Sequence, residues 1–426
     1  MNPLRMKEVY VLAGTRTPFS RMGSDLAQLS ASDLGREVTT ALLNQSGIDP
    51  HGIDEVIMGC VCQPADAANV ARVIALRSGI PEHIPAVTVH RNCASGFEAI
   101  TTAYERIQAN RGELYLVGGA ESMSNAPLLY NSGAVKKYGL LAKAKSLSAR
   151  LKVLSSFRPK DFAPIIGLQV GLTDPVSGLN MGQTAEVLAR EYDLSRTDLD
   201  TFAAESQGKA LQNTEARARE ISSIYTNGKA VNSDNGVRED SSVDRLARLR
   251  PVFDRKTGVV TAGNSSQITD GAVALLVGTS EAAQKHNLTP LGRLVDYAHV
   301  GCDPVRMGLG PVKAIEAVNH RAQLSLDDAD LIEINEAFAA QVLACTKALA
   351  DPEYAQKAGL SAPLGAIDPM KLNRLGGSIA LGHPVGATGA RLVLSALHQL
   401  QDTNQKRALV SACVGGGQGT ALWLES

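Results

Sequence analysis

The chain has 426 residues, a formal net charge of −1 at pH 7 and a hydrophobic content of 44%. This length is more than one ordinary hydrophobic core needs and indicates two or three domains. The near-zero charge excludes a general nucleic-acid-binding footprint, and no apolar run reaches the ~18 residues of a transmembrane helix.

The first predicted strand, residues 9–12, begins so early that it would leave no room for a signal peptide. Six cysteines in so long a chain do not indicate a disulfide scaffold. Cys60 and Cys62 are separated by one residue, so they lack the spacing of zinc and redox sites, and we expect no metal. We therefore predict a cytoplasmic protein with reduced thiols.

A turn of small residues, Asn92-Cys93-Ala94-Ser95-Gly96, comes next and precedes a helical pattern. Apolar residues then recur with helical spacing until Asn110, at Phe97, Ile100, Tyr104 and Ile107. A thiol attacks as the thiolate, and its pKa falls at a helix N-terminus or beside a histidine. We predict that Cys93 is a nucleophile of lowered pKa, the alternative being a buried structural thiol. His90 is a further candidate to line the site.

Residues 122–160 contain eight basic residues and no acidic one. Interleaved leucines predict basic amphipathic helices, in an inserted lobe that runs to about residue 268. This lobe is either a solvated charged face or a surface for an anionic partner. That partner would be the phosphates of a nucleotide-bearing substrate, a membrane, or another subunit.

Three further features lie in the C-terminal part. Asn335 ends a short apolar run, and His383 lies in a glycine-shaped turn where it can take a proton from a thiol. Cys413 opens a glycine-rich turn whose backbone N–H groups would face a bound acyl group. An incidental cysteine at a strand end is the alternative. A phosphate-binding loop is disfavoured, because no G-x-G-x-x-G pattern lies between strand and helix.

The two halves of the chain look like copies. In each, 20 residues separate a helix-initiating glycine from a strand: Gly96 from Leu116, and Gly389 from Leu409. Residues 11–15 also resemble residues 275–279. We predict a duplicated α/β unit with catalytic loops at strand ends, where open α/β sheets bind their ligands.

Together these turns resemble the thiolase family. The motifs Asn-Cys-Ala-Ser-Gly, Asn-Glu-Ala-Phe, Gly-His-Pro-x-Gly-x-Thr-Gly and Cys-x-Gly-Gly-Gly-Gln-Gly occur in the family's order, and the resemblance covers essentially the whole chain. It implies a five-layered α/β/α/β/α thiolase fold built from two duplicated halves with an inserted loop domain. We expect the divisions 1–121, 122–268 and 269–426. It also implies a homodimer or homotetramer.

The resemblance implies reversible thiolysis of 3-ketoacyl-CoA by coenzyme A, as in fatty acid β-oxidation, by a ping-pong mechanism without a permanently bound cofactor. Cys93 would be acylated, His383 would activate it, and Cys413 would shuttle protons. Asn335, through a water, would help His383 hold the enolate oxygen. The N–H groups of Cys93 and Gly415 would form a second oxyanion hole.

The same resemblance implies residues for substrate binding. Ala262 and Ser266 belong to a turn similar to the family's pantetheine-binding turn. Arg238 would lie against the adenine, and Met181 would line the acyl pocket.

The inserts resemble most the thiolase subunit of the trifunctional β-oxidation complex, which implies a hydratase–dehydrogenase partner. Asn335 departs from the histidine that is common in that group. An acetoacetyl-CoA-forming biosynthetic thiolase is the alternative function. Cys413 argues against a ketoacyl synthase, and the presence of Cys93, His383 and Cys413 together argues against a non-catalytic scaffold.

Overall fold

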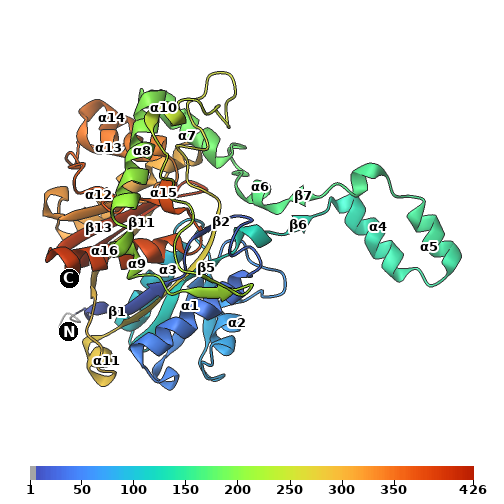
Figure 1. Ribbon diagram of the computed structural model, residues 1–426, viewed down its shortest axis with the longest axis horizontal. Helices are drawn as coiled ribbons and strands as arrows, with labels where there is room; N and C mark the ends of the chain where they lie inside the picture. Colours follow the sequence, from blue (N-terminus) through green and yellow to red (C-terminus); the bar gives the residue numbers. More distant parts are fainter. Residues whose placement is uncertain (1–5) are drawn as a thin grey trace.

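A computed structural model describes residues 6–426. Its centre is a sheet in which ten of the described strands are joined in one hydrogen-bonded order (Figure 1). The strands of the first half are, in spatial order, β4 (Ala86–Val89), β3 (Glu55–Gly59), β5 (Leu114–Glu121), β10 (Thr269–Gly278) and β1 (Val9–Arg16), with β2 (Ser20–Arg21) beside β10. Those of the second half are β12 (Leu331–Ile334), β13 (Arg407–Val414), β14 (Gln418–Glu425) and β11 (Gly292–Gly301).

Four strands of each half have the same arrangement, and β4 and β2 are additional strands of the first half. β3 runs parallel to β5 as β12 does to β13, and the next two pairings in each half are antiparallel. β1 and β11 occupy equivalent places and join the halves by pairing residues 9–11 with residues 292–294. This shared topology confirms the predicted duplication.

Helices complete the five layers that the resemblance implied. The inner layer contains α3 (Ser95–Gln108) and α16 (Thr388–Thr403), whose apolar faces share one core with both parts of the sheet. The outer helices are α1 (Ala31–Ser46) and α2 (Val70–Arg77) on the first half, with α12 (Gly310–Ala322) and α13 (Ala339–Ala350) on the second. The predicted five-layered fold is confirmed. Among the described residues, no helix is long and apolar enough to cross a bilayer.

The helix predicted after Cys93 is also confirmed. Its apolar residues are buried, and α3 ends at Gln108, before Asn110 turns left-handed with φ 56°. The helix–strand units α3–β5 and α16–β13 are counterparts, as the matching spacings predicted. The second sequence match is not a repeat, because residues 11–15 of β1 pair directly with β10 inside one half. The true counterpart of β1 is β11.

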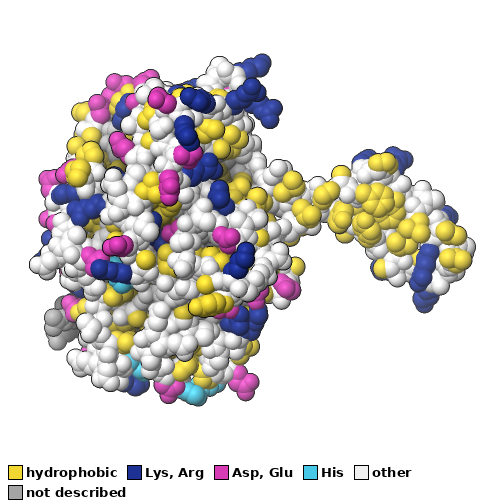
Figure 2. All heavy atoms as spheres, in the orientation of Figure 1, with side chains coloured by type: hydrophobic (Ala, Val, Ile, Leu, Met, Phe, Trp, Pro, Cys, Tyr) yellow, Lys and Arg dark blue, Asp and Glu magenta, His cyan; other side chains and the backbone are white. Residues whose placement is uncertain are grey.

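The inserted segment contains a long projection. β6 (Leu128–Leu129) pairs with β7 (Ile165–Ile166), and between them α4 (Ser132–Lys143) and α5 (Leu147–Leu154) stand away from the body (Figure 1). We call residues 128–166 the arm. Figure 2 shows apolar side chains gathered on this face of the arm, with basic side chains around them. The amphipathic helices predicted here are present.

The rest of the insertion returns to the body. It contains α6 (Gly167–Gly171), α7 (Met181–Glu191), α8 (Arg196–Gln212), α9 (Thr214–Ala218), β8 (Ile224–Thr226), β9 (Lys229–Val231) and α10 (Val243–Leu246). β10 follows it and lies between β5 and β1 of the first half. The domain divisions expected at residues 121 and 268 stay a prediction. The remaining helices are α11 (Ser280–Lys285), α14 (Pro352–Lys357) and α15 (Ser378–Leu381).

Candidate active site

The turn that carries Cys93 connects β4 to α3. Asn92 has a left-handed backbone, with φ 42°, which redirects the chain toward the helix. Ser95 fixes the turn, because its hydroxyl donates to the Asn92 carbonyl at 2.7 Å and accepts the Arg91 N–H at 2.9 Å. Cys93 itself is half-buried. Its sulfur therefore combines a fixed backbone with access to a substrate.

The Cys93 thiol is not ionised in advance. Burial raises its pKa and outweighs hydrogen bonds from the backbone N–H groups of Gly415 and Cys93, which lower it. The Glu121 carboxyl adds a further, smaller rise in this pKa. The lowered pKa predicted from the helix N-terminus is therefore wrong, because burial was not visible in the local sequence. A neutral thiol needs a base before it can attack.

His383 has the protonation state that such a base needs. Burial is the main cause that lowers its pKa to about 3, so the ring is neutral at pH 7. Nδ1 lies 2.7 Å from the Thr388 hydroxyl, which donates its own hydrogen to the Pro384 carbonyl at 3.0 Å. This network assigns the ring proton to Nδ1 and leaves a lone pair on Nε2.

Asn335 adjoins that lone pair. Its Nδ2 lies 3.4 Å from Nε2 of His383, and its Oδ1 accepts a 2.6 Å hydrogen bond from the Ser378 hydroxyl. The hydroxyl thereby orients the amide so that its donor faces the imidazole. The following Glu336 is an internal anchor, since its buried carboxyl accepts hydrogen bonds from three groups: the Ser206 hydroxyl, the Asn373 amide and the Ile379 N–H.

Cys413, at the end of β13, and the glycine turn that follows it lie beside Cys93. Burial raises the pKa of the Cys413 thiol well above its usual value, and the neighbouring Cys93 raises it further. The Asn92 side-chain amide donates to the Gly415 carbonyl at 2.7 Å. A Cβ on Gly415 would lie 3.2 Å from Sδ of Met181. The predicted residues Cys93, Cys413, Gly415 and Met181 are therefore brought together from three separate segments.

The turns of Cys93 and His383 meet through the inner helices. A Cβ on Gly96, at the start of α3, would lie 2.6 Å from the backbone nitrogen of Ala390 in α16. Close backbone contact of this kind excludes any side chain at Gly96. The N-terminal ends of the two helices therefore carry the nucleophile and the histidine into one region.

Glu121, at the end of β5, lies beneath this region. Its carboxyl accepts backbone N–H groups from Gly386 at 2.8 Å, Cys62 at 2.8 Å and Val61 at 3.1 Å. Burial is the main cause that raises the pKa of Glu121 to about 7. Sequence reasoning missed this residue, although one carboxylate closing an otherwise apolar strand was an available signal.

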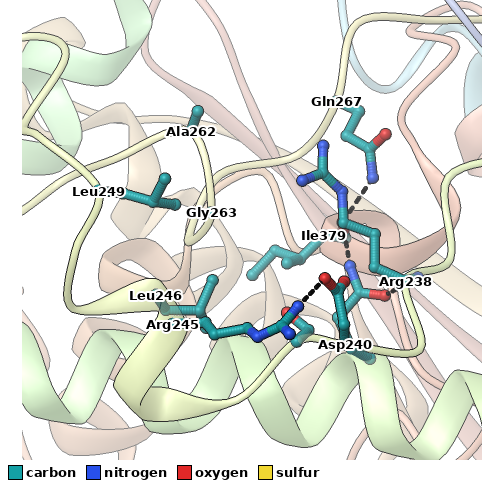
Figure 3. A pocket seen from close by; sticks show the side chains of 11 residues that line it. Arg238, Asp240, Arg245, Leu246, Leu249, Ala262, Gly263, Gln267 and Ile379 are labelled. Carbon is teal, nitrogen blue, oxygen red and sulfur yellow. Dashed lines mark hydrogen bonds and ion pairs between the residues drawn. The ribbon is translucent and has the colours of Figure 1, made fainter.

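A separate cleft of about 170 Å³ lies beside α8 and α10 (Figure 3). Two predicted residues, Arg238 and Ala262, line it. Arg245 is ion-paired with Asp240, whereas the exposed Arg238 has no ion pair within residues 6–426. A free guanidinium can bind a phosphate or stack on an aromatic ring. The other side chains at this cleft include Gln207, Leu246, Leu249, Gln267 and Ile379.

Three predicted residues do not line this cleft. Ser266 donates its backbone N–H to the Ala337 carbonyl at 2.9 Å. Met181 begins α7, and its sulfur lies on the side of Gly415. His90 is exposed, and its Nδ1 lies 3.4 Å from the Asn92 nitrogen.

Comparison with known proteins gives a consistent result. The family profile described as "Thiolase, N-terminal domain" matches residues 9–281, and "Thiolase, C-terminal domain" matches residues 288–426. The chain is 40% identical to a 3-ketoacyl-CoA thiolase of Pectobacterium carotovorum, over 99% of this chain and 97% of the relative. It is 40% identical to a β-ketoadipyl-CoA thiolase of Pseudomonas aeruginosa, over 98% and 99%. The human mitochondrial 3-ketoacyl-CoA thiolase in complex with CoA superposes with a TM-score of 0.85 and 36% identity, over 99% and 98%.

Proposed function

We infer, from the premise that this chain belongs to the thiolase family, that it is an acyltransferase that cleaves 3-ketoacyl-CoA with coenzyme A. The products are acetyl-CoA and a shortened acyl-CoA, as in fatty acid β-oxidation. Coenzyme A and acyl-CoA are substrates here. Relatives named for different acyl substrates match with the same identity of 40%.

The first half-reaction is proposed to begin at Cys93. Nε2 of His383 takes the thiol proton, and the sulfur attacks the 3-keto carbon of the substrate. The bond between carbons 2 and 3 then breaks, which leaves an acyl group on Cys93 and an acetyl-CoA carbanion. Cys413 protonates the carbanion, in agreement with the raised pKa that keeps its thiol protonated.

The second half-reaction regenerates the free thiol of Cys93. Cys413, now a thiolate, takes the proton of coenzyme A, whose sulfur attacks the acyl-cysteine and releases the shortened acyl-CoA. The Cys93 thiolate that leaves takes back the proton held on Nε2 of His383. We propose that the N–H groups of Cys93 and Gly415 stabilise the oxyanion of this acyl group, and that Asn335 and His383 stabilise the enolate oxygen of acetyl-CoA. The second pair is supported by the 3.4 Å contact between Asn335 and His383, and the first pair by its lowering effect on the pKa of the Cys93 thiol.

Coenzyme A is proposed to bind along the cleft of Arg238 and Ala262. Arg238, which has no ion pair in the described part of the chain, suits an adenine ring or a phosphate. Ser266 would contact the pantetheine chain of coenzyme A, which extends toward Cys93. Met181 would line the acyl pocket beside Gly415. A cytoplasmic location and a homodimer or homotetramer are part of the same proposal.

The arm is proposed to dock the protein on an anionic bilayer. Its apolar side chains Leu140, Leu147, Leu151 and Leu154 are exposed. Apart from Lys137, which pairs with Asp161, its basic residues have no ion pair within residues 6–426. Two arms in contact would set like charges against each other, which disfavours a second copy as the occupant. Interleaved leucines and cations are the pattern of helices that lie in a membrane interface.

One observation carries the mechanism: the Cys93 turn is joined to the Gly415 turn by the 2.7 Å hydrogen bond of Asn92, and it meets the His383 turn at the start of α3. Incubation with acetyl-CoA should therefore add one acetyl group to Cys93, seen by peptide mass spectrometry. Cys93→Ser should abolish both thiolysis and acetyl transfer. Acetyl label on Cys413 but never on Cys93 would reverse these two roles.

A further inference from the structure

We propose that Asn92 is a positioning residue that holds the oxyanion donor of Gly415 at a fixed distance from the Cys93 sulfur. This inference rests on the proposed roles of Cys93 and Gly415. It begins with a side chain for which the mechanism has no use. The Asn92 amide leaves the nucleophile turn of the first half and donates to the Gly415 carbonyl of the second half at 2.7 Å.

The glycine turn needs such a restraint. Gly415, Gly416 and Gly417 follow one another, and the last two have φ angles of 87° and 81°. Glycine has no intrinsic preference that would hold such a turn in one shape. On its far side the turn is held by the Cys302 N–H, which donates to the Gly417 carbonyl at 2.8 Å. On the side of the nucleophile, the Asn92 amide contacts it.

Both polar backbone groups of Gly415, its N–H and its carbonyl, face the turn of Cys93. Its N–H lies near enough to the Cys93 thiol to lower the pKa of that thiol. Its carbonyl accepts from Asn92, the residue directly before that cysteine. Asn92 and Cys93, which are consecutive in the nucleophile turn, thus fix the orientation of Gly415 in the glycine turn. A donor aimed at a developing oxyanion loses most of its value when its direction changes.

Asparagine is suited to this position for two reasons at once. It tolerates the left-handed backbone of φ 42° better than most residues with a side chain, and its amide supplies a hydrogen-bond donor. Aspartate tolerates the backbone, but it would set a carboxylate against the Gly415 carbonyl. Glycine tolerates the backbone and supplies no donor. These two replacements therefore separate the side-chain contact from backbone strain.

The test measures thiolysis and the pH dependence of Cys93 alkylation by iodoacetamide in the full-length protein. In Asn92→Gly we expect kcat to fall by about 10- to 100-fold, with KM for coenzyme A within about 2-fold of the wild type. The apparent pKa of alkylation should rise by about half a pH unit to one, because the N–H no longer points steadily at the thiolate. Asn92→Asp should lose more activity than Asn92→Gly.

A matched control is available at Asn110, which is exposed and also left-handed, with φ 56°. Asn110→Gly should leave kcat and the alkylation profile unchanged. Lower activity of Asn92→Gly with an unchanged alkylation pKa would mean a merely structural role and overturn the proposal, as would wild-type values of both. Failure of acetyl-CoA to label Cys93 in the wild type would instead refute the proposed function, independently of the Asn92 variants.

Discussion

Ser378 offers a direct test of how the imidazole and its neighbouring amide work together. Its hydroxyl donates to Oδ1 of Asn335 at 2.6 Å, in a buried setting. Ser378→Ala leaves that oxygen without a donor, and a buried unsatisfied acceptor costs about 1–3 kcal/mol. The amide can escape this cost by rotating, which would turn Oδ1 instead of Nδ2 toward Nε2 of His383.

Loss of about 1–2 kcal/mol of transition-state stabilisation lowers kcat by about 5- to 30-fold. We expect this decrease for Ser378→Ala in thiolysis of a 3-ketoacyl-CoA. Ser395→Ala is the control, because it also removes a buried hydroxyl, one that donates to Glu220 at 3.0 Å. Its kcat should stay within about 2-fold of the wild type. In an Asn335→Ala background Ser378→Ala should change little further. An equal decrease in both backgrounds would refute the reasoning.

Three other predictions concern the substrate, pH and the arm. Thiolysis of 3-ketoacyl-CoAs longer than acetoacetyl-CoA should be at least as efficient as that of acetoacetyl-CoA, whereas a steep loss of kcat/KM beyond four carbons would favour the biosynthetic enzyme. Burial raises the pKa of Glu121 from 4.5 to about 7, so the fold keeps a proton that the unfolded chain releases. Stability should therefore fall as pH rises through that window, by about 3 kcal/mol for this group, and Glu121→Gln should remove that part of the fall in urea denaturation. An unchanged slope would contradict this assignment. Reversal of Lys136, Lys143 and Lys145 to glutamate should abolish sedimentation with phosphatidylglycerol vesicles and leave KM for coenzyme A unchanged. Retained sedimentation would contradict docking on a bilayer, a raised KM would indicate substrate steering, and loss of oligomers or of a co-purifying subunit alone would indicate a protein partner.

The sequence predicted those parts of the protein that depend on neighbouring residues. The apolar spacing after Cys93 identified α3, because the residues on one face of a helix recur every three or four positions. The 20-residue spacings to Leu116 and Leu409 identified equivalent helix–strand units, because duplicated units keep their length. The basic composition of residues 122–160 predicted amphipathic helices but not their projection from the body.

Properties that depend on distant segments were not predictable in the same way. The pKa of Cys93 is dominated by burial, which other parts of the chain impose and the local turn does not reveal. The resemblance between β1 and β10 reflects two buried strands of similar composition that pair with each other. Ser378 carried no signal at all, since its function comes only from facing Asn335 across 43 positions of the chain.

The contact between Gly96 and Gly389 has an electrostatic consequence. It sets the N-termini of α3 and α16 against each other, so two positive poles of about half a charge each converge. In a neutral interior such poles repel. A negative charge that forms here is attracted by both poles, which offsets part of the burial that raises the pKa values of Glu121 and Cys93. The duplication of the scaffold thus directs two helix dipoles at the region where negative charge forms in the proposed reaction.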